Sequence, residues 1–297
     1  MSSGEEIVRW CLFFLLGFLM AGCSGPSGFK EHAKFVNEHM LDTSEVSKEY
    51  LSTGDFQLHF RQAGNAKKAV VVWVHGTPGN WTDGAYLYRD KSLITDTKLV
   101  LIDRPGWGES QYLDNPRVVT SFQQIGELIS PLLRKLKQEH PEVPLLLLGF
   151  SWGGSLVPAI ALDYPDLVDG LLVLSGGLDP ELTKPRWYNK AAKIRLVNAM
   201  IGDSMRKANV EMYALSPELA LLQNRLTEIS QPTIVIQGDT DKLVDPKNAD
   251  FAEEKFSSNR IRVIRLADQG HLLQLERTDL IAKCIYALID EDLKKCS

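Results

Sequence analysis

The sequence of 297 residues lacks an excess of basic charge, a cysteine cluster and an apolar run long enough to cross a membrane. Its formal net charge is −5, so no overall positive field would gather phosphates, which argues against nucleic acid as a partner. The four cysteines are too scattered for a metal site and too few for a disulfide framework, and we expect neither a metal nor another cofactor. With 44% hydrophobic and 24% charged residues, the chain is ordinary globular material, long enough for one large α/β domain with an insertion.

The longest apolar run, Trp10 to Ala21, follows Arg9 and is typical of an export signal, with roughly half of the ~20 apolar residues that a spanning helix needs. It ends in Leu19-Met20-Ala21-Gly22-Cys23-Ser24, which resembles the lipobox of bacterial lipoproteins. The resemblance implies that residues 1–22 are a signal peptide, that Cys23 is lipidated and that 23–48 form a tether. The protein would then be anchored to a membrane of the bacterial cell envelope, at the periplasmic face. A secreted protein, or a leader that stays in the membrane, is the alternative.

From about residue 50 the sequence has the pattern of alternating strands and helices. The alternation of Phe56, Leu58 and Phe60 with polar residues predicts a hairpin at a sheet edge. Helical periodicity predicts helices from Phe122 to about His140, from Ser155 to Leu162 and from Leu275 to about Lys295. Apolar runs predict buried strands at 69–74, 98–102, 145–148, 171–174, 233–237 and 260–266. This order indicates an α/β fold with a mostly parallel sheet and helices on both faces.

The closing helix carries a further expectation for the cysteines. If the helix continues to Lys295, Cys284 and Cys296 are separated by about 18 Å along its axis, which is too far for a disulfide.

Four leucines, Leu145 to Leu148, lead into Gly149-Phe150-Ser151-Trp152-Gly153. A buried strand followed by Gly-x-Ser-x-Gly predicts a nucleophile elbow, a sharp strand-to-helix turn that exposes the serine. On its own the pattern could equally be a glycine turn with a serine cap. A serine hydroxyl becomes a useful nucleophile only when a base and a site for the oxyanion are supplied as well.

The loops after the other predicted strands supply both. His75-Gly76-Thr77-Pro78-Gly79 and Asp103 to Ser110, with the elbow and the chain order serine, acid, histidine, resemble the α/β-hydrolase superfamily from about Tyr50 to Leu293. The resemblance implies an α/β-hydrolase fold with a small helical cap after the sixth strand. It also implies that the backbone N–H groups of Thr77 and Trp152 form the oxyanion hole.

The same resemblance implies a triad of Ser151 as nucleophile, His271 as base and Asp241 as the acid that orients it. Asp239 and Asp179 are the competing acids. His271 is preferred because it follows the last strand and precedes a helix. Among the other histidines, His75 is expected to shape its loop, His59 to lie on an edge strand, and His32, His39 and His140 to be solvated.

Residues 180–230 have helical periodicity without a strand, so we expect them to form the cap, with 49–179 and 231–297 as the hydrolase core. Between Lys184 and Arg195 the cap has five basic residues and no acidic one, with apolar residues between them. The simple interpretation is a solvated helix face. The alternative is a face that meets anionic material, either lipid headgroups or an acidic group on the substrate.

A serine at the elbow, where haloalkane dehalogenases and epoxide hydrolases of the superfamily have aspartate, indicates acyl chemistry on an ester, thioester or amide. We expect a monomeric, carboxylesterase-like enzyme acting on a small-molecule acyl substrate. The loops around His75 and Ser151 also resemble proline iminopeptidases. An aminopeptidase of that kind, an acyltransferase and a non-catalytic binding protein stay as alternatives.

Overall fold

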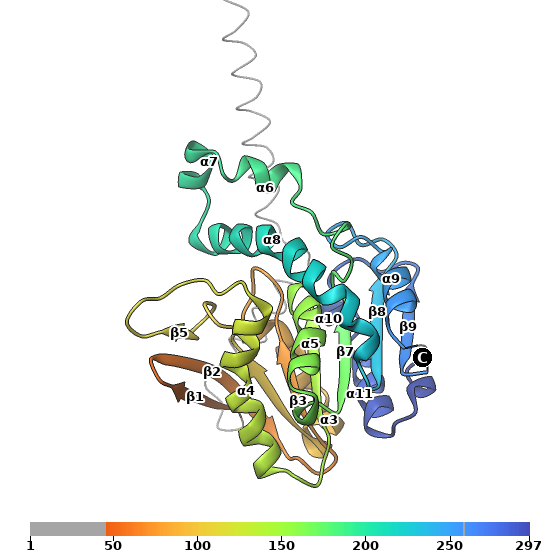
Figure 1. Ribbon diagram of the computed structural model, residues 1–297. Coiled ribbons are helices and arrows are strands. Elements are labelled where there is room, and N and C mark those ends of the chain that lie inside the picture. Colours follow the sequence, from red (N-terminus) through yellow and green to blue (C-terminus); the bar gives the residue numbers. More distant parts are fainter. Residues whose placement is uncertain (1–45, 258) are drawn as a thin grey trace, which may run out of the picture. The chain divides into compact units, whose positions relative to one another are not determined.

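The computed structural model describes residues 46–257 and 259–297 (Figure 1). The predictions for the signal peptide, for Cys23, for nearly all of the tether, and for His32 and His39 lie outside the described residues. Within the described ranges, no helix combines the length and the apolar character that crossing a membrane requires.

One sheet of nine strands, counted over the described residues, forms the centre of the molecule in the order β1-β2-β4-β3-β6-β7-β8-β9, with β5 paired to β2. The strands from β4 to β9 along this order are parallel, while β1, β2 and β5 pair antiparallel. The predicted α/β fold with a mostly parallel sheet is confirmed. The bounds are β1 Ser47–Thr53, β2 Phe56–Gly64, β3 Ala69–Val74, β4 Thr97–Ile102, β5 Gln111–Tyr112, β6 Leu145–Phe150, β7 Gly170–Leu174, β8 Thr233–Gly238 and β9 Ile261–Leu266.

Helices cover both faces of the sheet. On one face α4 (Phe122–Glu139) packs on α5 (Trp152–Asp163), and α9 (Asn248–Lys255) packs on β8 and β9. On the other face lie η1 (Trp81–Arg89), α3 (Lys91–Asp96) and α11 (Thr278–Ile289), with α10 (Leu273–Glu276) against η1. Every residue of β3, β6, β7 and β8 is buried, as expected of parallel strands covered on both sides. Because these strands are parallel, their carboxyl ends lie at one edge of the sheet, where the predicted loops meet.

The segment between β7 and β8 contains α6 (Trp187–Ala191), α7 (Arg195–Met200), α8 (Asp203–Leu222) and η3 (Gln223–Glu228), and no strand. Leu215, Leu219 and Leu222 of α8 join the main core. In Figure 1, α6 and α7 lie on the far side of α8 from the sheet.

Two expectations at the ends of the described chain were wrong. The edge strand is β1; β2 lies between β1 and β4, so His59 is buried. The closing helix is also broken: α11 ends at Ile289, Glu291 adopts φ +52°, and η4 (Leu293–Lys295) runs back along α11. Cys284 and Cys296 consequently come within 4.4 Å between their Cα atoms and form a disulfide.

Candidate active site

The turn at Ser151 has the strained backbone of a nucleophile elbow. Ser151 has φ +52° and ψ −118°, between the end of β6 and the start of α5. Its two flanking glycines are required by space: a Cβ on Gly149 would lie 2.3 Å from the Gly153 carbonyl oxygen, and one on Gly153 would lie 2.3 Å from that of Val74. A plain helix cap needs no such turn, because capping residues adopt ordinary extended angles. Strain of this kind is typical of functional sites.

The three predicted triad residues meet in space. His271 Nε2 lies 3.0 Å from Ser151 Oγ, and His271 Nδ1 lies 2.7 Å from Asp241 Oδ2. Asp241 Oδ1 accepts the backbone N–H groups of Leu243 and Val244, and Gln237 donates to Oδ2. Burial acts to raise the pKa of Asp241, but the hydrogen bond and charge of His271 and these backbone donors outweigh it, so the pKa is lowered. Asp241 thus stays ionised beside the imidazole.

The competing acids are engaged elsewhere. Asp239 pairs with Arg265 at 2.9 Å, and Asp179 Oδ1 accepts the backbone N–H of Glu181. Among the three acids considered, Asp241 is therefore the one that contacts His271.

The loop predicted to hold an oxyanion lies against the nucleophile. A Cβ on Gly76 would lie 3.1 Å from Ser151 Cβ, so the loop that continues into Thr77 runs directly past the elbow. Trp152 is the first residue of α5, and N–H groups in the first turn of a helix have no partner within the helix. The assignment of the Thr77 and Trp152 N–H groups as oxyanion donors stays a prediction.

His75, at the end of β3, is held as a neutral ring. Its Nε2 accepts the Arg104 backbone N–H at 2.9 Å, so Nδ1 carries the proton and donates to the Gly76 carbonyl at 2.7 Å. Burial, and then the charge of Arg104, lowers the pKa of His75 well below its usual value. His75 shapes the loop, as expected.

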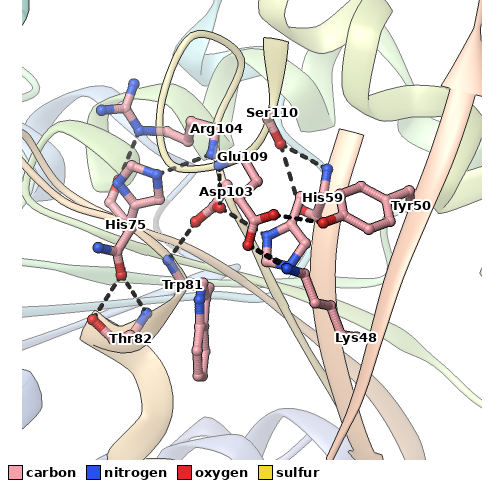
Figure 2. Close-up of polar contacts among 11 residues, drawn as sticks. Lys48, Tyr50, His59, His75, Trp81, Thr82, Asp103, Arg104, Glu109 and Ser110 are labelled. Atoms are coloured by element: carbon pink, nitrogen blue, oxygen red, sulfur yellow. Dashed lines mark hydrogen bonds and ion pairs between the residues drawn. The ribbon is translucent and has the colours of Figure 1, made fainter. Parts of the chain in front are cut away.

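Asp103, directly after β4, joins the oxyanion loop to the neighbouring loop (Figure 2). Its carboxylate accepts the backbone N–H groups of Trp81 and Glu109, both at 2.8 Å, and contacts His59 Nδ1 at 2.8 Å. Gly108 is required beside it, because a Cβ there would lie 2.0 Å from Asp103 Oδ2. This network accounts for the buried His59. The prediction for His140 was also wrong, since its side chain is partly buried at the end of α4.

Arg104 and Glu211, which the sequence analysis did not single out, form a fully buried ion pair beneath the site. The Arg104 guanidinium donates to both Glu211 oxygens, at 2.6 and 3.0 Å, and to the carbonyls of His75 and Gly76. Trp107 Nε1 also donates to Glu211. Since Glu211 belongs to α8, the pair ties that helix to the oxyanion loop. Arg104 occupies the variable position of the loop Asp103-Arg104-Pro105-Gly106, and Glu211 lies 107 residues away, so no local pattern in the sequence identifies the pair.

No group of three or more His, Cys, Asp or Glu side chains in 46–257 and 259–297 is arranged to hold a metal ion.

Comparison with known proteins places these features in a family. A family model described as serine aminopeptidase, S33, matches residues 65–219, just over half of the chain. A Mycoplasma pneumoniae protein provisionally named a proline iminopeptidase is 31% identical over 43% of this chain, but the match covers only 40% of that relative's length. A poly(3-hydroxyalkanoate) depolymerase of Ectopseudomonas oleovorans is 23% identical over 69% of this chain and 79% of its own.

Solved structures agree with the fold. The crystal structure of Cfl2 from Burkholderia cenocepacia superposes with a TM-score of 0.66 at 16% identity, over 82% of this chain and 96% of that one. A structural similarity at 16% identity supports the fold alone. Through the family match and the strand order, this chain belongs to the serine aminopeptidase S33 family and is an α/β hydrolase.

Proposed function

We propose that the protein is a serine hydrolase that cleaves an acyl bond of an ester, thioester or amide through an acyl-enzyme on Ser151. The observation that carries the proposal is the continuous hydrogen-bonded path from Ser151 Oγ through His271 to Asp241, with distances of 3.0 and 2.7 Å. Nucleophile, base and orienting carboxylate are within hydrogen-bonding reach of one another.

The steps follow from this geometry. His271 Nε2 takes the Ser151 proton as Oγ attacks the substrate carbonyl carbon, and the N–H groups of Thr77 and Trp152 stabilise the tetrahedral oxyanion. The intermediate collapses as His271 gives the proton to the leaving alcohol, thiol or amine. Water then attacks the acyl-enzyme with His271 as base, which releases the carboxylic acid and restores Ser151.

Esters are favoured over the amino-terminal peptides that the family description suggests. Recognition of a free amino terminus needs an available acidic side chain near the site. The buried acid of the cap segment, Glu211, is already paired with Arg104 and Trp107, and Glu218 accepts the Phe122 backbone N–H. The depolymerase that is similar over 69% of this chain is named for a polyester, which agrees with this preference.

The test is labelling by a fluorophosphonate together with turnover of p-nitrophenyl esters and of proline p-nitroanilide. Wild type is expected to react with the fluorophosphonate and to turn over the esters faster than the anilide. Ser151→Ala is expected to show neither labelling nor turnover. Ser155→Ala, one turn further along α5, is the matched control and should still label. Unchanged labelling of Ser151→Ala would overturn the mechanism, and faster anilide turnover would assign an aminopeptidase.

We also propose that the protein is exported and anchored through Cys23. The Cys284–Cys296 disulfide supports export, since disulfides persist mainly in oxidising compartments outside the cytosol.

A further inference from the structure

The outer part of the segment between β7 and β8 exposes large apolar side chains close together. Trp187 is 76% exposed, Leu196 72% and Met200 65%, and α7 buries none of its residues. Tyr188 and Ile194 are exposed as well. Single exposed apolar residues are ordinary, but a group of this size on two adjacent short helices marks a surface that another body covers. We call these five residues the apolar cap surface.

Basic residues alternate with the apolar cap surface along the sequence. The stretch from Lys184 to Gly202 has five basic residues and no acidic one, although the whole chain carries −5. Three of the five are engaged: Arg186 with the carbonyls of Lys242 and Leu243, Lys184 with Glu181, and Lys193 over the Tyr213 ring. Lys190 and Arg195 are exposed and have no ion-pair partner in the described part of the chain.

This combination matches a lipid interface. Surfaces that lie in a membrane interface present Trp and Leu beside Lys and Arg, so that apolar groups enter the acyl boundary while the cations meet anionic headgroups. A second copy of the chain fits less well. A two-fold contact would set each basic patch against its own copy, and like charges facing each other oppose association.

We propose that the apolar cap surface, with Lys190 and Arg195, docks on an anionic lipid bilayer. Trp187 and Leu196 enter the interfacial layer, and the two cations lie at the headgroups. This surface is separate from the triad, so docking requires no catalysis. Arg186 takes no part in it, because it holds α6 to the loop that follows Asp241.

The experiment uses residues 24–297 with Ser151→Ala, because the apolar run and the proposed anchor at Cys23 would bind vesicles by themselves. With Ser151→Ala the lipids are not consumed, and the result does not depend on the proposed hydrolysis. Co-sedimentation with phosphatidylcholine vesicles with and without phosphatidylglycerol measures the partition coefficient. Lys190→Gln with Arg195→Gln should weaken binding to the anionic vesicles about fivefold per charge, on the order of 25-fold together, at low salt. Trp187→Ala with Leu196→Ser should weaken it as well. The matched control is Leu221→Ser, which alters a side chain that is 75% exposed on α8 and should bind as the parent does.

Quenching of tryptophan fluorescence by lipids brominated in the acyl chain reports insertion. Among the described tryptophans Trp187 is the exposed one, so quenching should fall sharply in Trp187→Phe. Cap variants that bind and quench like the Leu221→Ser control would overturn the proposal. So would sedimentation equilibrium showing a dimer that Leu196→Ser dissociates, since a second copy would then cover the surface.

Discussion

At Asp241 the structure shows how one side chain fixes the direction of another. Its Oδ2 meets His271 Nδ1, so the ring must carry its proton there and present a bare Nε2 to Ser151. Two backbone donors hold Oδ1 and prevent the carboxylate from rotating away.

We predict that Asp241→Asn lowers kcat for an aryl ester by on the order of 10⁴, because an amide can donate to Nδ1 and stabilise the wrong tautomer. Asp239→Asn and Asp179→Asn are the matched controls and should retain nearly full activity, since neither contacts His271. Steady-state kinetics decide the matter. A large loss of kcat in Asp179→Asn together with a small loss in Asp241→Asn would show that the orienting acid is Asp179, in the loop after β7.

Two titrating groups near the oxyanion loop have opposite effects on stability. Burial lowers the pKa of His75 well below 6.5, and burial, with Asp103 adding to it and Arg104 opposing it, raises the pKa of Asp83 to about 7. Below pH 6.5 the unfolded chain therefore binds a proton at His75 that the folded chain rejects, so this stability is lost as pH falls. Asp83 has the opposite effect, because between pH 3.8 and about 7 the folded chain keeps a proton that the unfolded chain releases. The stability that this proton contributes is therefore lost as pH rises.

The predicted consequence is that the difference in stability between each variant and wild type follows the pH dependence of the group that the variant removes. Relative to wild type, the free energy of unfolding of Asp83→Asn should rise with pH up to 7, and that of His75→Gln should fall with pH up to 6.5. Each difference has a limit of about 1.4 kcal/mol per pH unit for one proton. Urea unfolding from pH 4 to 8 measures both. Curves parallel to wild type in both variants would contradict the assignment.

At the scale of elements, α8 is fastened to the loop after β4 by the buried pair of Arg104 and Glu211. Removing one partner leaves an uncompensated buried charge, so Glu211→Ala should lower the free energy of unfolding by about 3–5 kcal/mol. Arg104→Met with Glu211→Leu should recover much of this loss, because it removes both charges. The kcat of this double variant should stay low, because it also loses the hydrogen bonds from Arg104 to the His75 and Gly76 carbonyls. Wild-type stability of Glu211→Ala would show that the pair contributes little.

The end of the chain is held to α11 by the Cys284–Cys296 disulfide, which closes a loop with a sequence separation of 12. Loops of about this size lose roughly 3 kcal/mol of stabilisation when the bond is removed. We therefore expect reductant to lower the Tm of wild type to that of Cys284→Ser with Cys296→Ser, and to leave the double variant unchanged. Thermal denaturation followed by circular dichroism tests this, and a Tm insensitive to reductant would count against it.

At the scale of the whole molecule, the parallel sheet brings every predicted loop to one edge because the strands share a direction. The proposed anchor would hold this enzyme at a membrane. Cys23→Ser is expected to move the full-length protein from the membrane fraction to the soluble fraction or to block its processing. Fractionation and intact-mass spectrometry measure this, and an unmodified Cys23 in the native protein would rule the anchor out.

The sequence by itself determined the features that are local in the chain. Buried strands are continuous apolar runs, and the elbow needs glycine at 149 and 153 because neighbouring backbone fills the space. Only the tertiary structure decided which carboxylate faces His271, that Glu211 meets Arg104 from 107 residues away, and that His59 is buried. The same holds for the return of Cys296 to Cys284, which depends on the turn at Glu291. These contacts join residues that are far apart in the sequence and meet only when the sheet and helices pack, so no local sequence pattern predicts them.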